Sequence, residues 1–313
     1  MPGLNINISV SVSVIVAVYN DWIALDECLH SIELQDWKSG LEIIVVDDGS
    51  DEPAPQKIRE RERSLPLKIV KQPHAGISAA RNHGISLSSG SILLFTDADC
   101  RLEANCLAAL ESTIAATPQR NYFQLRLVGD CSRFIGKTEH LRLIAIQSHT
   151  LQADGCIRYL NTAGFAVRRS GVQAQIERGL FDPAALRGED TLLLAGLIER
   201  GDLPFFVAGA AVQHDVALSV LQCLRKDMKS AFLEGKTFAL IAARGIKVRM
   251  SNRERLSMIR RVWMASKEPS IGRAAWFILT VRQALSRLAF VVYRLRRGRS
   301  DLRSANPSLE TQL

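Results

Sequence analysis

Two carboxylates directly after a short apolar run are the first residues of this sequence whose types and spacing could do chemistry. The run 93–96 contains apolar and β-branched residues, and Asp97 and Asp99 follow it with one small residue between them. Such a run is typical of a buried strand. Because ligands bind beyond the carboxyl ends of strands in open α/β sheets, the two carboxylates are candidates for holding a divalent cation, which could in turn hold a substrate's phosphates.

Three other side chains with suitable chemistry lie at predicted strand ends or helix starts. Tyr19 and Asp48 each follow an apolar run, and Arg81 lies near the start of a predicted helix. An aromatic ring can stack on a base, and a carboxylate can accept a hydrogen bond from the imide N–H of uracil. An arginine near a helix start can meet a diphosphate. Together these groups point to a nucleotide cleft.

Strands and helices alternate along the part of the chain that would position these groups. Strands are predicted at 10–18, 41–46, 67–70 and 91–96, and helices at 21–35, 52–64 and 75–88. This alternation predicts the α/β class, with a mostly parallel nucleotide-binding sheet flanked by helices. Later segments are predicted as strands at 123–128, 164–167 and 205–212 and as helices at 133–150, 186–200, 217–243, 253–267 and 270–297. We expect a catalytic domain at 1–216, a helical region at 217–298 and a disordered tail at 299–313.

Composition favours an intracellular protein with a sizeable core. The chain has 313 residues, of which 47% are hydrophobic, and its six cysteines form no C-x-x-C pair. This cysteine usage predicts reduced thiols. The first residues lack a basic region followed by an apolar core, so no signal peptide is predicted and the expected location is the cytoplasm.

The charge is distributed unevenly along the chain. Residues 1–220 carry 20 Lys and Arg against 26 Asp and Glu, a net charge of −6, whereas residues 221–313 carry 20 against 6, a net charge of +14. Arg282 and Arg287 interrupt the apolar stretch 274–293, which excludes a membrane-spanning helix. Two alternatives remain open for the basic region: peripheral contact with a membrane surface, or packing on the main domain. No aromatic-basic pattern of a known module supports nucleic-acid binding.

The sequence resembles the inverting, family-2-like glycosyltransferases with the GT-A fold. Four segments carry the resemblance, in order and at the expected spacing: SVIVAVYN (13–20), VVDDGSD (45–51), AGISAARN (75–82) and FTDAD (95–99). By position, the resemblance implies that Ala17, Tyr19, Asp48, Arg81 and Asp97 bind the nucleotide-sugar. It implies that Asp99 binds the metal.

Further along the chain, a pair of acidic residues lies at the position where the family has its catalytic base. Glu189 and Asp190 open the predicted helix that follows Gly188, and Asp190 is the candidate base with Glu189 beside it. Helix capping is the alternative, because acidic residues favour the first turn. His214 falls where many members of the family place a histidine that completes the metal site. Imidazole is a suitable ligand for Mn²⁺ and a tolerable one for Mg²⁺.

The resemblance also bears on the acceptor side and on the number of sugars transferred. Gly164, in the stretch 161–169, matches a strand that lies against the sugar, although glycine-containing strands have other structural uses. The chain lacks the Q-x-x-R-W motif of processive synthases. We therefore expect transfer of a single sugar, with inversion and with Mn²⁺ or Mg²⁺, from a UDP-linked donor to a hydroxyl of a glycan, lipid-linked or other acceptor. The alternatives are a catalytically silent nucleotide-sugar-binding or membrane-recruited scaffold, and a nucleotidyltransferase.

Overall fold

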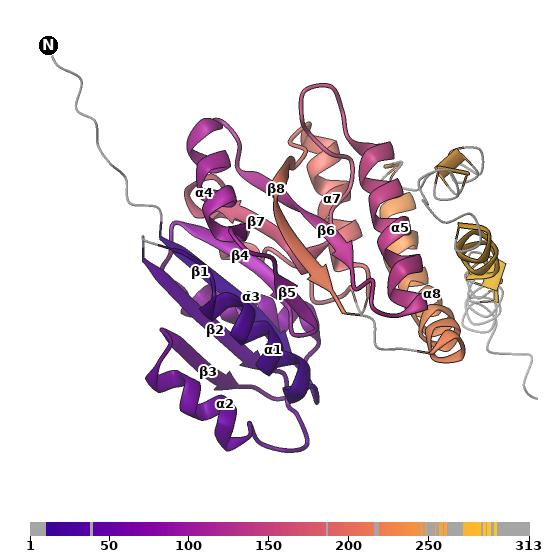
Figure 1. Ribbon diagram of the computed structural model, residues 1–313. Helices are drawn as coiled ribbons and strands as arrows, with labels where there is room; N and C mark the ends of the chain where they lie inside the picture. The colour runs from indigo at the N-terminus through magenta and orange to yellow at the C-terminus, as the bar shows by residue number, and fades with distance from the viewer. Residues whose placement is uncertain are drawn as a thin grey trace, which may run out of the picture.

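A single eight-stranded sheet forms the centre of the protein in a computed structural model (Figure 1). The structure describes residues 11–37, 40–185, 187–215, 219–243, 245–246 and 248, and single residues or short runs between 254 and 292. The strands are β1 (Val12–Val18), β2 (Leu41–Asp47), β3 (Leu67–Lys71), β4 (Ile92–Asp97), β5 (Cys100–Leu102), β6 (Tyr122–Gly129), β7 (Phe165–Arg168) and β8 (Phe205–His214). The longer helices are α1 (Trp22–Glu33), α2 (Gln56–Glu60), α3 (Ile77–Leu87), α4 (Cys106–Ala116), α5 (Phe134–Thr150), α6 (Gln173–Arg178), α7 (Glu189–Arg200) and α8 (Val220–Ala243).

The first half of the sheet is parallel and the second half is mixed. The strand order is β3-β2-β1-β4-β7-β6-β8-β5, with β1, β2, β3 and β4 parallel to their neighbours in that group. β7 runs antiparallel to β4 and to β6, whereas β6 and β8 are parallel. This α/β architecture with a mixed sheet flanked by helices confirms the predicted fold class.

Helices cover both faces of the sheet because the strands are apolar on both faces. Val14 and Val16 of β1 belong to a core cluster that includes residues of α1 and α4. Ile15, which points to the opposite face, belongs to a second cluster with residues of α3 and α7. Alternate strand residues point to opposite faces, so one continuous apolar strand such as β1 serves both cores.

Strand register sets the positions of the functional side chains. Ala17 of β1 pairs with Val46 of β2 and with Asp97 of β4, so the carboxyl ends of three parallel strands meet at one edge of the sheet. At the other end of the sheet, Cys100 of β5 pairs with His214 of β8. Because β5 begins three residues after Asp97, this pairing brings His214 next to Asp99, whose carbonyl accepts a hydrogen bond of 2.9 Å from the N–H of Asp215.

Residues 100–120 carry no predicted element, yet they form β5 and α4. β5 has three residues, and its strand conformation depends on pairing with β8, more than 100 residues further along the chain. A pattern within so short a segment cannot signal such a strand. The region 205–212, predicted as one or two short strands, is part of the single strand β8, which has ten residues.

A described helix of the C-terminal region packs on α5. Residues 272–282 form a helix, and its Ala275 and Leu279 belong to a buried cluster with Leu141 and Ala145 of α5. Figure 1 shows this helix on the same side of the molecule as α5 and α8. Among the described residues, no helix is sufficiently long and apolar to cross a membrane. The predicted tail 299–313, and most of the predicted helix 253–267, lie outside the described residues.

Candidate active site

A cavity of about 570 Å³ lies at the carboxyl ends of β1 and β4. The start of α7, one face of α8, part of α5 and residues 161–163 also contribute to its lining. The structure brings eight of the ten predicted site residues to this one cavity: Ala17, Tyr19, Arg81, Asp97, Asp99, Glu189, Asp190 and His214. The other two, Asp48 and Gly164, are not among its lining residues.

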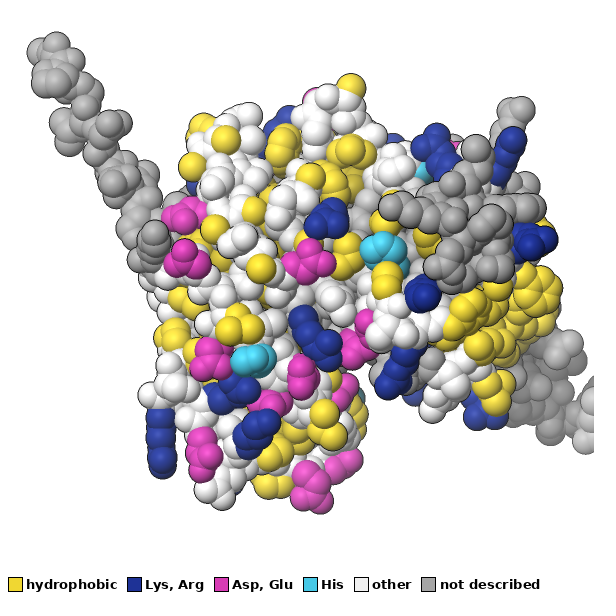
Figure 2. All heavy atoms as spheres, viewed as in Figure 1, with side chains coloured by type: hydrophobic (Ala, Val, Ile, Leu, Met, Phe, Trp, Pro, Cys, Tyr) yellow, Lys and Arg dark blue, Asp and Glu magenta, His cyan; other side chains and the backbone are white. Residues whose placement is uncertain are grey.

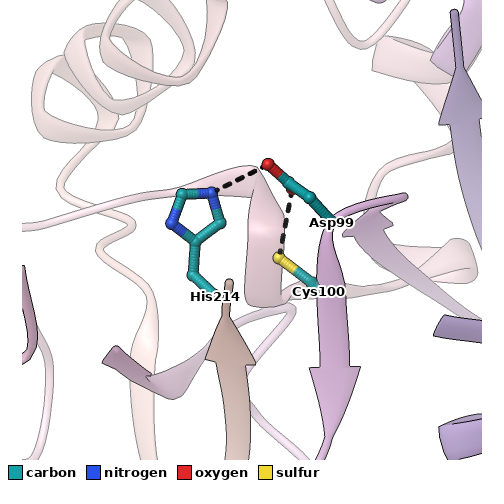
Figure 3. Close-up of side chains that lie close together, drawn as sticks. All are labelled: Asp99, Cys100 and His214. Carbon is teal, nitrogen blue, oxygen red and sulfur yellow. Dashed lines mark hydrogen bonds and ion pairs between the residues drawn. The ribbon is translucent and has the colours of Figure 1, made fainter. Parts of the chain in front are cut away.

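A carboxylate and an imidazole meet at one wall of the cavity. Oδ2 of Asp99 lies 3.3 Å from Nε2 of His214, and the Sγ atom of Cys100 lies 3.8 Å from Oδ1 of Asp99. Figure 3 shows the three side chains pointing toward one another. Burial alone would raise the pKa of Asp99, but the hydrogen bond and charge of His214 hold it below its ordinary value. The aspartate is therefore ionised at neutral pH.

This cluster fits a divalent cation. The candidate ligand atoms of Asp99, Cys100 and His214 all lie within 4.8 Å of one another. Ligand atoms about 2.0–2.2 Å from a common ion lie roughly 3 Å apart when their bonds to it are near perpendicular, which the pair Asp99–His214 matches. Burial and the nearby carboxylates raise the pKa of the Cys100 thiol well above its ordinary value. The carboxylate and the imidazole are thus the stronger ligands, and their chemistry suits Mn²⁺ or Mg²⁺.

Arg81 joins two parts of the site that are far apart in the sequence. Its side chain is only 1% exposed, Nη1 donates to Glu189 at 2.6 Å and Nη2 donates to Asp97 at 2.6 Å. The guanidinium also lies 5.5 Å from the centre of the Phe181 ring. Charged hydrogen bonds of this kind are among the strongest in proteins. Arg81 therefore fixes the start of α7 against the end of β4, and two of its nitrogens are already occupied by protein carboxylates.

The two acidic residues at the start of α7 have different environments. Glu189 is paired with Arg81, whereas Oδ1 of Asp190 accepts hydrogen bonds, among the described residues, from the neighbouring Thr191, from its N–H at 2.6 Å and from Oγ1 at 3.1 Å. Burial, followed by the charge of Glu189, raises the pKa of Asp190 to about 7. A carboxylate with such a pKa can take a proton near neutral pH.

Helix capping, the alternative reading of these two residues, applies to Asp190 but not to Glu189, because Oδ1 of Asp190 accepts a hydrogen bond from the free backbone N–H of Thr191 in the first turn of α7. The N-cap residue of α7 is Gly188, which has a left-handed backbone with φ of 78° and makes no side-chain cap hydrogen bond. Glycine adopts this conformation without steric cost. Since Glu189 turns to Arg81, its carboxylate is not used to satisfy the free N–H groups of the helix.

The predicted base-binding residues Tyr19 and Asp48 lie close to one loop. Oδ1 and Oδ2 of Asp48 accept hydrogen bonds from the backbone N–H groups of Ala75 and Gly76, both at 2.9 Å, and the residue is 4% exposed. Tyr19 is 48% exposed and its ring stacks on His74 at 4.5 Å. Asp48 thus shapes the loop before α3, and Tyr19 offers a ring face at the rim of the cavity. A contact between Asp48 and a base stays a prediction.

Gly164 is packed behind the cavity wall. A Cβ atom at this position would lie 2.8 Å from Cδ2 of Leu127, and its carbonyl accepts a hydrogen bond of 2.9 Å from Gln124. The preceding residues 161–163 line the cavity in its place. The predicted role of Gly164 in sugar binding stays untested, and the structure gives this glycine a packing role.

Four charged residues that carry no predicted function form a network on the part of the cavity lining contributed by α5, α8 and the helix 272–282. Arg282 forms a bidentate ion pair with Asp227 of α8, and its Nη1 lies 3.3 Å from Oε2 of Glu139 in α5. Glu139 in turn accepts hydrogen bonds from Arg142, whose Nε–H lies between both carboxylate oxygens, with Nε 3.0 Å from each, and whose Nη2 donates to Oε1. All four line the cavity. The spacing of Glu139 and Arg142 predicts a helical pair, but their link to Arg282 depends on tertiary packing.

Known proteins are similar to this chain in sequence over its first half. The model of the family described as glycosyl transferase family 2 matches residues 13–174, which is more than half of the chain. Glycosyltransferase AglE of Haloferax volcanii is 38% identical over 106 residues, covering 33% of this chain and 35% of that protein. Glycosyltransferase GlyA of Streptococcus pneumoniae is 38% identical over 101 residues, covering 32% of this chain. The matched regions span 35% and 14% of those two proteins.

Solved structures show the same fold over a longer part of the chain. The mannosyltransferase PcManGT of Pyrobaculum calidifontis, in complex with GDP-Man and Mn²⁺, superposes with a TM-score of 0.62 at 20% identity, covering 91% of this chain and 86% of that one. TarS of S. aureus in complex with UDP-GlcNAc gives a TM-score of 0.54 at 16% identity, covering 91% and 92%. At these identities the likeness concerns the fold alone. Because the sequence match includes the strand-end motifs that line the cavity, the chain belongs to glycosyl transferase family 2.

Proposed function

We propose that this protein transfers a single sugar from a UDP-linked donor to an acceptor hydroxyl, with inversion and with a divalent cation. The observation that carries this proposal is the placement of Asp190, a carboxylate with a pKa of about 7, in the same cavity as the Asp99–His214 pair. A base near neutral pH and a cation site in one cavity are the two requirements of such a transfer.

In the proposed mechanism, Asp190 acts as the general base. The ionised carboxylate takes the proton of the acceptor hydroxyl while that oxygen attacks the anomeric carbon from the face opposite the nucleotide. The bond from the anomeric carbon to the diphosphate breaks in the same step, so the configuration inverts. General-base assistance contributes about 10²–10⁴-fold to such rates. Arg81 holds Glu189, and with it the start of α7, at the end of β4 where the donor binds.

The donor would occupy the strand-end side of the cavity. Tyr19 offers a ring on which the base can stack, and Ala17 and Asp97 lie at the paired ends of β1 and β4, where the ribose would lie. Asp99 and His214 would hold Mn²⁺ or Mg²⁺, which when bound neutralises charge on the leaving diphosphate. Glu189 supports the base through its pairing with Arg81 rather than by proton transfer.

The two other functions left open by the sequence have less support. A catalytically silent scaffold does not require Asp190 to have a raised pKa beside a buried arginine–carboxylate pair. A nucleotidyltransferase typically carries a glycine-rich basic loop after its first strand, whereas β1 is followed here by Tyr19, Asn20 and Asp21.

The direct test of the proposed function is nucleotide release from a panel of sugar donors. UDP-, GDP- and dTDP-linked sugars are incubated with the protein and Mn²⁺, with and without simple glycosides as acceptors, and the freed nucleoside diphosphate is measured. We expect release from UDP-sugars, and an inverted anomeric configuration in the product by NMR. Release from no donor, by protein shown to be folded, would contradict the proposal.

The pH dependence of transfer should report the ionisation of Asp190. Because its pKa is raised to about 7, the carboxyl is protonated at lower pH and cannot accept a proton. The maximal rate should therefore reach a plateau above pH of about 8 and fall about tenfold per unit well below pH 7. The measurement is the maximal rate at saturating donor between pH 5 and 9.

Glu189→Gln tests the cause of that pKa. Removal of the neighbouring negative charge should stabilise the ionised form of Asp190 and move the acid limb to lower pH. Glu199→Gln, which neutralises an exposed carboxylate at the far end of α7, is the matched control and should leave the limb in place. An unchanged limb in Glu189→Gln would show that the charge of Glu189 does not contribute to this pKa, whose larger cause is burial. A limb that persists in the residual rate of Asp190→Asn would show that the titrating group is not Asp190.

We further propose that the C-terminal region contacts an anionic membrane surface, which would bring the cavity to a lipid-linked or membrane-proximal acceptor. The helix 272–282 buries Ala275 and Leu279 on α5, so packing accounts for one of its faces. Phe277 on another face is 62% exposed. Figure 2 shows hydrophobic side chains gathered on the side of the molecule where α8 and this helix lie. The charge of +14 after residue 220 supports such contact.

Vesicle sedimentation tests the membrane contact. The intact protein should sediment with phosphatidylserine-containing vesicles at low salt, and Phe277→Glu should reduce the bound fraction severalfold, since it places a carboxylate on an apolar contact face. Ile23→Glu is the control, because Ile23 is 85% exposed on α1 and far along the chain from the basic region. Protein that stays in the supernatant, or equal losses in the two variants, would contradict the proposal.

A further inference from the structure

The helix α8 presents a row of polar side chains to the cavity. Cys223, Lys226, Asp227, Ser230 and Glu234 all line it, and their spacing of three or four residues places them on one face of the helix. This helix lies outside the residues that the family model matches. A ligand bound in the cavity would contact this face of α8.

Arg81, which the family resemblance places against the nucleotide, already has two protein carboxylates as partners. Its side chain is 1% exposed and donates to Asp97 and Glu189. Arg187, just before the start of α7, lines the cavity as well; it is exposed, and its backbone carbonyl accepts a hydrogen bond from Thr237 toward the end of α8. Arg142 and Arg282 also line the cavity, and they are paired, with Glu139 and Asp227. The positive charges of Arg81, Arg142 and Arg282 are thus matched within the protein.

Lys226 differs from these arginines. It lines the cavity, its residue is exposed, and it forms no ion pair within the part of the chain that the structure describes. It lies in the first turns of α8, which begins soon after His214, whereas Arg187 contacts Thr237 toward the other end of that helix, so Lys226 lies toward the Asp99–His214 side of the cavity. Asp227, the next residue, is the nearest carboxylate in sequence, but Arg282 holds it in a bidentate pair.

The charge network also fixes the position of α8. Arg282 joins α8 to α5 by contacting both Asp227 and Glu139, and these side chains are 10–20% exposed. Burial alone would raise the pKa of Glu139, but the charges of Arg142 and Arg282 hold it well below its ordinary value. A buried network in which every charge is paired resists rearrangement, because removing one partner strands the other. Lys226 is therefore carried on a helix that is held in place.

We infer that Lys226 is a catalytic residue that binds the donor's diphosphate and stabilises its negative charge as it leaves. This inference rests on the proposed function and deepens it. As the bond to the anomeric carbon breaks, its electron pair goes to the diphosphate oxygen, and the ammonium group of Lys226 donates a hydrogen bond to that diphosphate without losing its proton. The interaction strengthens as charge develops, which is the condition for lowering the barrier.

The test is a comparison of nucleoside and nucleoside diphosphate binding. Uridine and UDP are titrated by calorimetry into the wild type and into Lys226→Met, in EDTA and in Mn²⁺, with guanosine/GDP and thymidine/dTDP in parallel. Loss of one charged hydrogen bond should weaken diphosphate binding about 10- to 100-fold and leave nucleoside binding unchanged. The loss should be present in EDTA, since the lysine acts on the diphosphate itself.

Lys229→Met is the matched control, because Lys229 is an exposed lysine of α8 that does not line the cavity. Lys226→Arg should recover part of the diphosphate affinity. Unchanged UDP affinity in Lys226→Met, or equal weakening of uridine and UDP, would overturn the inference while leaving the proposed function intact. Failure of the wild type to bind any of the three diphosphates would overturn both, and the wild type alone would reveal it.

Discussion

Asp190→Asn is expected to abolish sugar transfer while the donor still binds. Asparagine keeps the size of the side chain and the oxygen that accepts the hydrogen bonds from Thr191, so the start of α7 should keep its shape. The amide cannot accept a proton from the acceptor hydroxyl. The maximal rate should fall by about 10²–10⁴-fold, which is the usual contribution of a general base.

The measurement separates binding from chemistry. The dissociation constant of the UDP-sugar is determined by calorimetry, and the maximal rate is determined at saturating donor and acceptor; only the rate should change. Asp182→Asn, which alters an exposed aspartate in the loop before α7, controls for the substitution. A variant that binds donor poorly but turns over at the normal maximal rate would remove Asp190 from the role of base.

The sequence predicts most of the first half of the fold because its signals there are local. β1, β2 and β4 are largely apolar runs, and Tyr19, Asp48 and Asp97 lie at or directly after their ends, whereas Arg81 lies in the helix that follows β3. Parallel strands place their carboxyl ends at one edge of a sheet. The element order is therefore sufficient to predict that Tyr19, Arg81, Asp97 and Asp99 lie at one cavity.

The partners of these groups could not be predicted, because they depend on contacts between distant segments. Arg81 and Glu189 are separated by 108 residues, and nothing near Arg81 indicates that its guanidinium would be paired with protein carboxylates. The pairing of Cys100 with His214 depends on a strand of three residues. The network of Arg282, Asp227 and Glu139 joins three helices whose packing no local pattern specifies.

The structure also alters the choice of cation for the leaving group. From sequence, Arg81 is the natural candidate, since it lies near a helix start. Its burial between Asp97 and Glu189 suits a residue that positions the proposed base, and we infer that Lys226, from a helix outside the family match, supplies an exposed charge to the leaving group instead. Sequence motifs thus identify the residues of the site more readily than their roles within it.

Asp99→Ala is expected to have the other large effect, through loss of the divalent cation. The carboxylate of Asp99 faces Nε2 of His214 at 3.3 Å, and its removal leaves the imidazole as the main remaining ligand. A bound cation commonly contributes several kcal/mol of transition-state stabilisation. The maximal rate with Mn²⁺ supplied should therefore fall on the order of 10³-fold or more.

Mn²⁺ affinity provides a readout of this prediction besides activity. Mn²⁺ binding in the presence of UDP, measured by electron paramagnetic resonance, should weaken at least tenfold in Asp99→Ala and in His214→Ala. Asp36→Ala, which removes an exposed aspartate outside the cavity, should bind Mn²⁺ like the wild type. The prediction fails if Asp99→Ala retains full activity and Mn²⁺ affinity, or if chelation leaves the wild-type rate unchanged. In either case, cationic side chains of the protein would have to stabilise the negative charge that develops on the leaving diphosphate. The effect of Lys226→Met on the maximal rate should then exceed its effect on UDP binding.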